Sequence, residues 1–111
     1  MNFKINAGEF KHHIFIERFI NSVSDENIPI KQWILLFKTR AKILNVRGAE
    51  AVKASGNTSA IEKTFYIRFT KKYNLNSKDR IIYNNEIYNI IYVNNIEEAC
   101  FYLEVKCRKC D

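Results

Sequence analysis

The stretch TFYIRFT, residues 64–70, has the pattern of a half-buried β-strand. Its apolar positions alternate with polar ones, as they must in an extended segment with one buried face and one wet face. The buried face would carry Phe65, Ile67 and Phe69. The wet face would carry Thr64, Tyr66, Arg68 and Thr70. Threonine, aromatic and β-branched residues favour strands, so we interpret this stretch as the central strand of a small β-barrel.

The N-terminal half predicts two more strands and one helix. Residues 13–18 alternate well enough for a first strand, and residues 21–29 contain the polar residues and proline typical of a loop. Residues 32–46 read as a long strand with charged residues on one side. Its other side would carry Trp33, Leu35, Phe37, Thr39, Ala41 and Ile43. Residues 48–54 are rich in helix formers and precede Gly56, a plausible terminator, so one short helix is expected between strands.

The C-terminal half predicts a hairpin and a last strand. Residues 80–83 and 86–93 flank Asn84-Asn85, and asparagine tolerates the positive φ of a two-residue turn. Residues 71–78 and 94–98 read as loops. The last strand would face the core with Phe101, Leu103, Val105 and Cys107. Together these segments predict an all-β fold, a small antiparallel barrel of about six strands with one short helix inserted between strands.

The chain of 111 residues has the length of one domain, so residues 1–111 form a single unit in which residues 1–7 are expected to be a flexible arm. A chain of this size buries roughly two thirds of its unfolded surface, so it needs no disulfide or metal to fold. It has no apolar run long enough for a membrane helix. Its start does not read as a signal peptide, and we expect synthesis in the cytoplasm.

The net charge of +6 leaves a nucleic-acid interpretation open. Residues 63–80 carry six basic side chains against Asp79 alone. Four tyrosines would add a stacking surface for single strands, namely Tyr66, Tyr88, Tyr92 and Tyr102. Lysine outnumbers arginine, however, whereas arginine leads where phosphates are bound bidentately. A solvated basic loop is therefore the preferred interpretation, and a basic nucleic-acid-binding barrel is the alternative.

No residue pattern predicts catalysis, a metal or a cofactor. Cys107 and Cys110 form a single C-x-x-C with Cys100 nearby, and a zinc site would need His12 or His13 to complete four ligands. Adjacent histidines in a strand face opposite ways, so they cannot easily share one metal. Three glycines cannot build a phosphate loop. A zinc- or redox-linked role stays a minor alternative, and an enzyme is the least favoured interpretation.

The order of these landmarks resembles the phage head–tail joining family, also called head–tail adaptor or head-closure proteins. The resemblance is carried by Gly8-Glu9-Phe10 before the first strand, by Gln32-Trp33, by Thr39-Arg40-Ala41-Lys42-Ile43 and by Gly48-Ala49-Glu50. It continues through residues 64–69, Asp79-Arg80-Ile81, Tyr88-Asn89-Ile90 and residues 103–107. It departs where the family has arginine at His13, tryptophan at Arg40 and glycine at Asn85. The similar segments span nearly the whole chain.

The resemblance implies a non-enzymatic virion protein of a tailed phage or prophage. Such proteins form a ring, typically twelve-fold, at the head–tail connector, where they contact portal or adaptor proteins and tail proteins and close the head around packaged DNA. It implies no small-molecule substrate and no membrane. The loop between the second and third strands would face the channel with Arg47, Glu50, Lys53, Ser55, Gly56 and Asn57. Two further loops would make subunit interfaces with Asp25, Glu26, Lys31, Lys71, Lys72 and Lys78.

Overall fold

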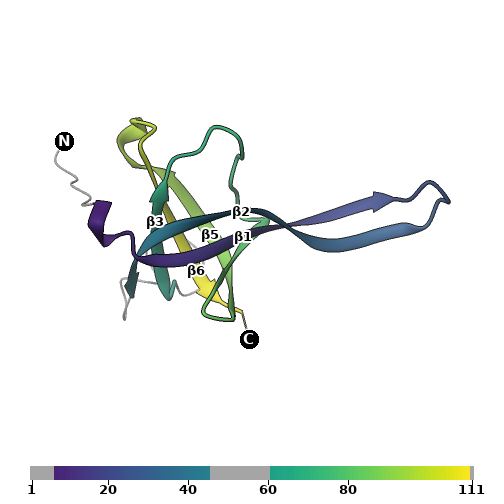
Figure 1. Ribbon diagram of the computed structural model, residues 1–111, viewed down its shortest axis with the longest axis horizontal. Coiled ribbons are helices and arrows are strands. Elements are labelled where there is room, and N and C mark those ends of the chain that lie inside the picture. The colour runs from purple at the N-terminus through teal and green to yellow at the C-terminus, as the bar shows by residue number, and fades with distance from the viewer. Residues whose placement is uncertain (1–6, 46–60, 111) are drawn as a thin grey trace.

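The computed structural model describes residues 7–45 and 61–110 (Figure 1). The strands are β1 (His12–Val23), β2 (Pro29–Asn45), β3 (Lys63–Arg68), β4 (Asp79–Tyr83), β5 (Glu86–Asn95) and β6 (Tyr102–Lys109). Short 3-10 turns, η1 (Ala7–Glu9) and η2 (Ile96–Glu98), precede β1 and β6. The helix expected over residues 48–54 and, apart from Ala7, the arm expected over residues 1–7 lie outside the described residues.

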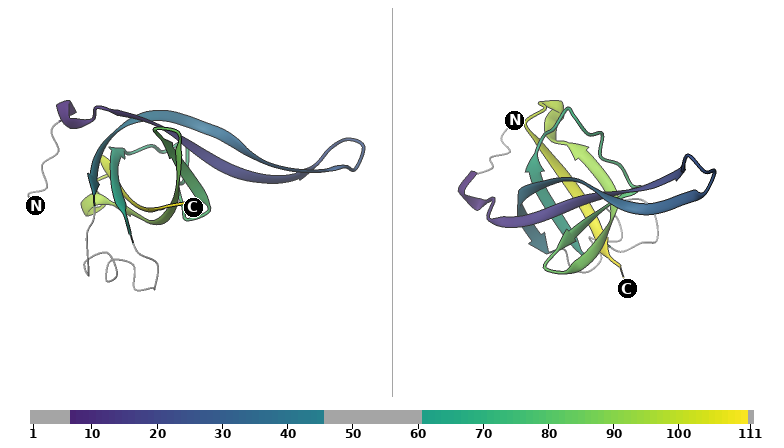
Figure 2. Two further views of the ribbon diagram at one scale, coloured as in Figure 1. Left: turned by 90° about the horizontal axis from the view of Figure 1, so that it is seen from below. Right: turned by 45° about the vertical axis from the view of Figure 1, so that its right-hand side comes forward.

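The six strands form a closed barrel in the order β1-β2-β3-β6-β5-β4, with every neighbouring pair antiparallel. Figure 2 (left) shows the strands as a ring seen nearly along the barrel. The predicted fold class is therefore confirmed. Closure pairs each strand on both sides within the barrel wall and so removes open sheet edges there.

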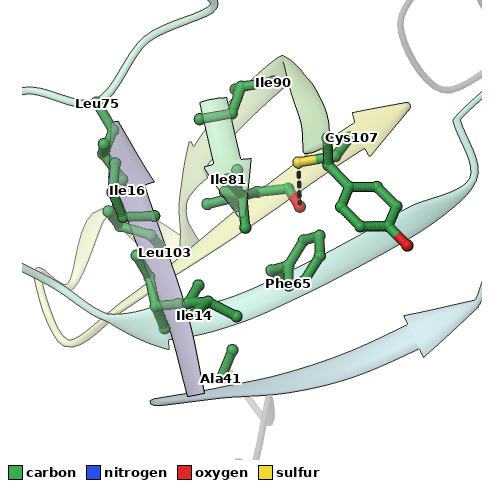
Figure 3. Packing of buried hydrophobic residues seen from close by; sticks show 12 residues of the cluster. Ile14, Ile16, Ala41, Phe65, Leu75, Ile81, Ile90, Leu103 and Cys107 are labelled. Carbon is green, nitrogen blue, oxygen red and sulfur yellow. Dashed lines mark hydrogen bonds between the residues drawn. The ribbon is translucent and has the colours of Figure 1, made fainter. Parts of the chain in front are cut away.

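The barrel interior is filled by apolar side chains from all six strands (Figure 3). Phe65 and Ile67 of β3, the residues that defined the strand pattern, are fully buried there. Each such side chain contributes about 1.5–3 kcal/mol when it leaves water. Leu103, Val105 and Cys107 of β6 also point inward, as their alternation predicts.

The connection from β3 to β4 crosses one end of the barrel. These two strands lie opposite each other in the strand order, so residues 69–78 must span the opening. Leu75 of this connection is buried and joins the core cluster. Tyr73 stacks on Phe37 of β2, with ring centroids 5.1 Å apart. The predicted polar loop is therefore a cover for the barrel end, with exposed lysines on its outside.

A bulge in β2 reverses the alternation that the sequence predicted. Ile16 of β1 pairs with Phe37, but the next residue, Glu17, pairs with Leu35, so Leu36 is an extra residue. A bulge moves every residue beyond it to the other face of the sheet. The prediction that Trp33 and Leu35 share the inner face with Phe37 is therefore wrong. Trp33 is 37% and Leu35 52% exposed on the outside.

The wet face predicted for β3 is also wrong in part, because Thr64 and Tyr66 are buried. The cross-strand partners of Tyr66 are Lys42 of β2 and Glu104 of β6. Glu9 of η1 forms an ion pair with Lys42, the β2 partner of Tyr66, at 2.7 Å. On the other side of Tyr66, its hydroxyl donates a hydrogen bond to Glu104 at 2.9 Å. Cross-strand neighbours thus flank a side chain that alternation assigned to water.

Two predicted boundaries differ from the structure. Phe101 precedes β6 and is 70% exposed, because Cys100 has a φ of 61° and turns the chain just before the strand begins. The loop predicted over residues 21–29 shrinks to residues 24–28, since β1 runs to Val23 and β2 starts at Pro29. The Asn84-Asn85 turn is confirmed, with φ values of 53° and 63°.

Candidate assembly surfaces

The hairpin made by residues 19–33 leaves the barrel as a two-stranded arm (Figures 1 and 2). β1 pairs with β4 from Phe15 to Arg18. Beyond Arg18, among the residues that the structure describes, the two strands of the arm pair only with each other. The arm runs across the direction of β3 and β6 and stretches the molecule to 53 Å, against 29 and 26 Å in the other directions. A two-stranded ribbon of this kind is marginally stable in water by itself.

Apolar side chains gather on the arm and at its root, which we define as the residues around Arg18 and Trp33 where the arm meets the barrel. They have no covering layer in the described structure. The exposed fractions are 43% for Phe19, 63% for Val23, 55% for Ile28, 37% for Trp33 and 52% for Leu35. Single exposed apolar residues are ordinary, but a contiguous group marks an interaction surface. The outer face of the arm pairs Phe19 with Trp33 and Val23 with Pro29. The arm therefore has the character of a contact surface.

The root of the arm is fastened on its outer side by Trp33. Its ring lies edge-on to Phe19 at 5.4 Å between centroids, and the guanidinium of Arg80 sits 3.9 Å from its ring centre. Arg80 also forms an ion pair with Glu17 at 2.8 Å. Such cation–π contacts contribute about 0.5–1 kcal/mol at exposed sites. This cluster therefore joins the two strands of the arm to β4.

On its other side, the root is held by Arg18. Its guanidinium donates two hydrogen bonds to the Asp79 carboxylate, at 2.7 and 2.9 Å, and one to the carbonyl of Asn74 at 3.0 Å. The hydrogen bonds to Asp79 raise the pKa of Arg18 above its ordinary value. Asp79 also accepts a hydrogen bond from the backbone N–H of Asn76 at 3.2 Å. Arg18 therefore ties the arm root to the β3–β4 connection.

The tip of the arm, residues 24–28, is organised by Ser24. The Ser24 hydroxyl accepts hydrogen bonds from the backbone N–H groups of Glu26 and Ile28, and Asn27 takes a positive φ of 64°. Asp25 and Glu26, two predicted interface residues, are exposed at this tip. Lys31, a third, is exposed on β2 within the arm. The tip is therefore acidic and is flanked by the apolar Val23 and Ile28.

The remaining predicted interface lysines lie around the β3–β4 connection. Lys71, Lys72 and Lys78 are exposed, and the Lys72 ammonium lies 5.4 Å from the centre of the Tyr73 ring. The same connection forms one wall of a cavity of about 510 Å³. Apolar lining comes from Phe69, Tyr73, Leu75, Val93 and Leu103. The structure thus brings the basic loop and an apolar hollow together at one barrel end.

Other predicted residues are less informative. Arg47, Glu50, Lys53, Ser55, Gly56 and Asn57 lie outside the described residues. Within residues 7–45 and 61–110, no three His, Cys, Asp or Glu side chains gather as a metal site. Cys107 is buried, and burial raises the pKa of its thiol, while Cys100 and Cys110 are exposed. His12 contacts the Tyr83 hydroxyl at 3.2 Å through Nδ1.

The predicted tyrosine stacking surface does not form as a unit. Tyr66 and Tyr88 are buried, Tyr102 is half-buried against Phe10, and Tyr92 is 45% exposed. Two basic residues of the segment 63–80 are engaged within the chain. Lys63 donates to the Asn45 side chain at 2.6 Å, and Arg80 pairs with Glu17. The described surface therefore offers little that favours binding of single-stranded nucleic acid.

A family model for phage head completion proteins matches residues 5–109. The chain belongs to this family. It is thus a structural protein of phage heads, a virion component that works together with other virion proteins, and membership implies a non-enzymatic role. No curated protein matches the chain. The described residues include no helix long and apolar enough to cross a bilayer.

Solved structures share the fold of this head completion family member. A protein of Shigella flexneri 2a, solved in solution, aligns with a TM-score of 0.71 at 20% identity, over 95% of this chain and 96% of that one. A chain from the virion of a native gene transfer agent particle aligns with a TM-score of 0.62 at 13% identity, over 90% and 94% of the two chains. At these identities the likeness shows a shared fold.

The sequence interpretation missed the arm, the most exposed feature of this head completion protein. A usable signal was present, since Phe19, Val23, Trp33 and Leu35 bracket a short polar turn at spacings that a hairpin brings together. The polar residues of the turn made the whole segment look like a loop. The cavity could not be found in the same way, because its walls come from segments distant in sequence.

Proposed function

We propose that this chain assembles as a ring at the head–tail connector, where it closes the DNA-filled head and offers a docking surface to the tail. Membership of the phage head completion family is the observation that carries the proposal. The ring would form on a portal or adaptor protein, and packaged DNA would pass through it. The family resemblance favours a ring of twelve subunits.

The shape of the subunit supports assembly by repetition. The closed barrel is a compact body, and the arm extends sideways from it far enough to reach a neighbour (Figure 1). A contact between two different surfaces of identical subunits closes into a ring when the rotation between them permits. The exposed apolar side chains of the arm supply one such surface, since burying them on a partner releases ordered water and stabilises the contact.

The two ends of the barrel would serve different tasks. Asn45 and Lys63, which flank residues 46–60, lie at the same end as the Asn84-Asn85 turn. We place Arg47, Glu50, Lys53, Ser55, Gly56 and Asn57 toward the DNA channel. The opposite end presents Lys71, Lys72 and Lys78, which would contact a neighbouring subunit or a connector protein together with Asp25, Glu26 and Lys31.

Electron microscopy of particles from an induced lysogen lacking this gene tests the role. Separate tails beside heads that have lost their DNA are expected, and a plasmid copy of the gene should restore complete particles. Complete, infectious particles without the gene would contradict the proposal. The expected fraction of joined particles in the deletion strain is close to zero.

The channel assignment has its own test. Deleting residues 54–58 should leave the barrel folded, since none of its described strands is shortened, and should give heads that leak DNA. Heads that stay sealed with residues 54–58 removed would contradict the channel assignment alone.

A further inference from the structure

The acidic, apolar tip of the arm and the basic-rimmed cavity are complementary surfaces on one chain. We infer that the arm tip of one copy docks at the cavity beside the β3–β4 connection of the next copy. This inference rests on the proposed ring and names the contact that would build it. The tip contributes Val23, Asp25, Glu26 and Ile28. Lys71 lines the cavity, and the exposed Lys72 follows it with its ammonium 5.4 Å from the ring centre of Tyr73, another cavity residue.

Both surfaces present apolar side chains. Val23 is 63% and Ile28 55% exposed, which is unfavourable for aliphatic side chains held on a projecting hairpin. The cavity of about 510 Å³ has room for side chains of this size, and aromatic and aliphatic residues make much of its wall. Next to it, Phe101 is 70% exposed and its carbonyl accepts a hydrogen bond from the N–H of Phe69, a cavity residue. Docking would cover apolar surface on both sides.

The charges give the contact a direction. Residues 24–28 carry two carboxylates and no basic residue, whereas residues 69–78 carry three lysines and no acid. Glu97 and Glu98 of η2 follow Asn95, another cavity residue, and would repel the tip from that rim. The tip would therefore approach over the lysine side. Complementary charges of this kind mainly steer association and set register.

The contact cannot form within one chain, because the arm cannot reach its own cavity. Arm and barrel share the continuous strands β1 and β2, and Arg18 and Trp33 hold the root on both sides. The tip therefore lies at the far end of the 53 Å axis (Figure 2). The residues that line the cavity belong to the barrel and to the β3–β4 connection. Because tip and cavity are different surfaces, each copy has one of each to offer, and the contact repeats head to tail.

Disulfide trapping in assembled particles tests the contact. In a background with Cys100→Ser and Cys110→Ser, the pair Asp25→Cys and Lys72→Cys should give a ladder of dimers and larger species when particles are oxidised, lost again on reduction. The matched control pairs Asp25→Cys with Arg108→Cys, another exposed basic position, near the C-terminal end of β6. It should remain monomeric. Monomers from both pairs, or equal ladders from both, would overturn the inference.

Charge exchange provides an independent test. Replacing Asp25 and Glu26 by lysine, or Lys71 and Lys72 by glutamate, should reduce complementation of the deletion lysogen at least tenfold. Combining both changes in one chain should restore most of it, since the attraction is rebuilt with reversed sign. If the combined variant is no better than either half while circular dichroism shows all three folded, the tip and the lysines are not partners.

The two levels of proposal fail in different ways. If deleting the gene leaves complete particles, the proposed function falls, whatever the trapping shows. If heads close only when the gene is present but the trapping pair stays monomeric in those heads, the function stands and this contact is wrong. Trapping of Asp25→Cys to a portal, adaptor or tail protein instead of a second copy would also overturn the inference and identify that protein as the occupant.

Discussion

Arg18 and Asp79 are 61 residues apart in the chain, yet they form a bidentate ion pair at the point where the arm leaves the barrel. The side chain of Asp79 is fully buried, whereas Arg18 is 33% exposed. A carboxylate taken out of water needs a charged donor to compensate its lost hydration. This one contact therefore links the first residue of β4, the cover of the barrel end and the root of the arm.

Arg18→Ala should lower the free energy of unfolding by about 2–3 kcal/mol, because it leaves the buried Asp79 carboxylate without its charged partner. Arg18→Lys should lower the free energy of unfolding by less, about 1 kcal/mol, since an ammonium keeps the charge but not the bidentate geometry. Urea denaturation measures both changes. Hydrogen exchange at the Asn76 and Asp79 amides should quicken in Arg18→Ala. An alanine variant as stable as the parent would show that the pair contributes nothing net.

Thiol labelling should separate the three cysteines. Burial raises the pKa of Cys107, and its thiol points at the Val105 carbonyl in the core (Figure 3). The thiolate is the reactive form, so Cys107 should label at least a hundredfold more slowly than the exposed Cys100 and Cys110 in the folded protein. Mass spectrometry of maleimide-treated samples should show two labels in buffer and three in denaturant. Prompt triple labelling in buffer would contradict the core placement.

Alkaline pH should destabilise the fold through Tyr88. Burial, together with a hydrogen bond to Glu86 at 3.0 Å, raises the pKa of Tyr88 to about 12 from its ordinary 10.0. The unfolded chain then loses this proton at lower pH than the folded one, so the stabilisation is complete below about pH 10 and is lost between pH 10 and 12.

The difference in stability between parent and Tyr88→Phe measures this effect, since phenylalanine keeps the ring and removes the titration. The stability of the parent should fall by about 1–2 kcal/mol more than that of Tyr88→Phe across this interval. Tyrosinate absorbance gives a second reading, because Tyr66 and Tyr88 should ionise at higher pH in the folded protein than in the unfolded chain. Parallel pH profiles for the two proteins would contradict the prediction.

In the turn between β4 and β5, glycine at position 85 should leave the stability almost unchanged, whereas alanine should lower it. Asn84 and Asn85 both have positive φ, at 53° and 63°, a region that costs other non-glycine residues about 1 kcal/mol or more. The free energy of unfolding of Asn85→Gly should stay within about 0.5 kcal/mol of the parent value. Glycine relieves the strain of positive φ, but its greater freedom in the unfolded chain offsets that gain. Asn85→Ala should lose about 1 kcal/mol. Thermal unfolding measures both, and equal losses would show that the backbone is not the cause.

The sequence by itself determined the strands that obey a simple period. Phe65 and Ile67, and likewise Leu103 and Val105, alternate because each strand has one side in the core, and the core side is where they lie. The sequence also predicted the Asn84-Asn85 turn, because the tolerance of asparagine for positive φ is a local property of those residues. These local signals, added along the chain, were enough for a barrel of about six antiparallel strands.

Only the tertiary structure decided what depends on segments far apart in the chain. The extra residue Leu36 turns Trp33 and Leu35 outward because the pairing of β2 with β1, rather than the period of β2, sets which face they occupy. Tyr66 is buried where Lys42 of β2 and Glu104 of β6 flank it, and Glu104 accepts its hydrogen bond. The arm exists because β4 stops pairing with β1 at Arg18, and the cavity exists because the β3–β4 connection must cross the barrel end. A period in sequence describes one strand, whereas burial and exposure are set by everything packed against it.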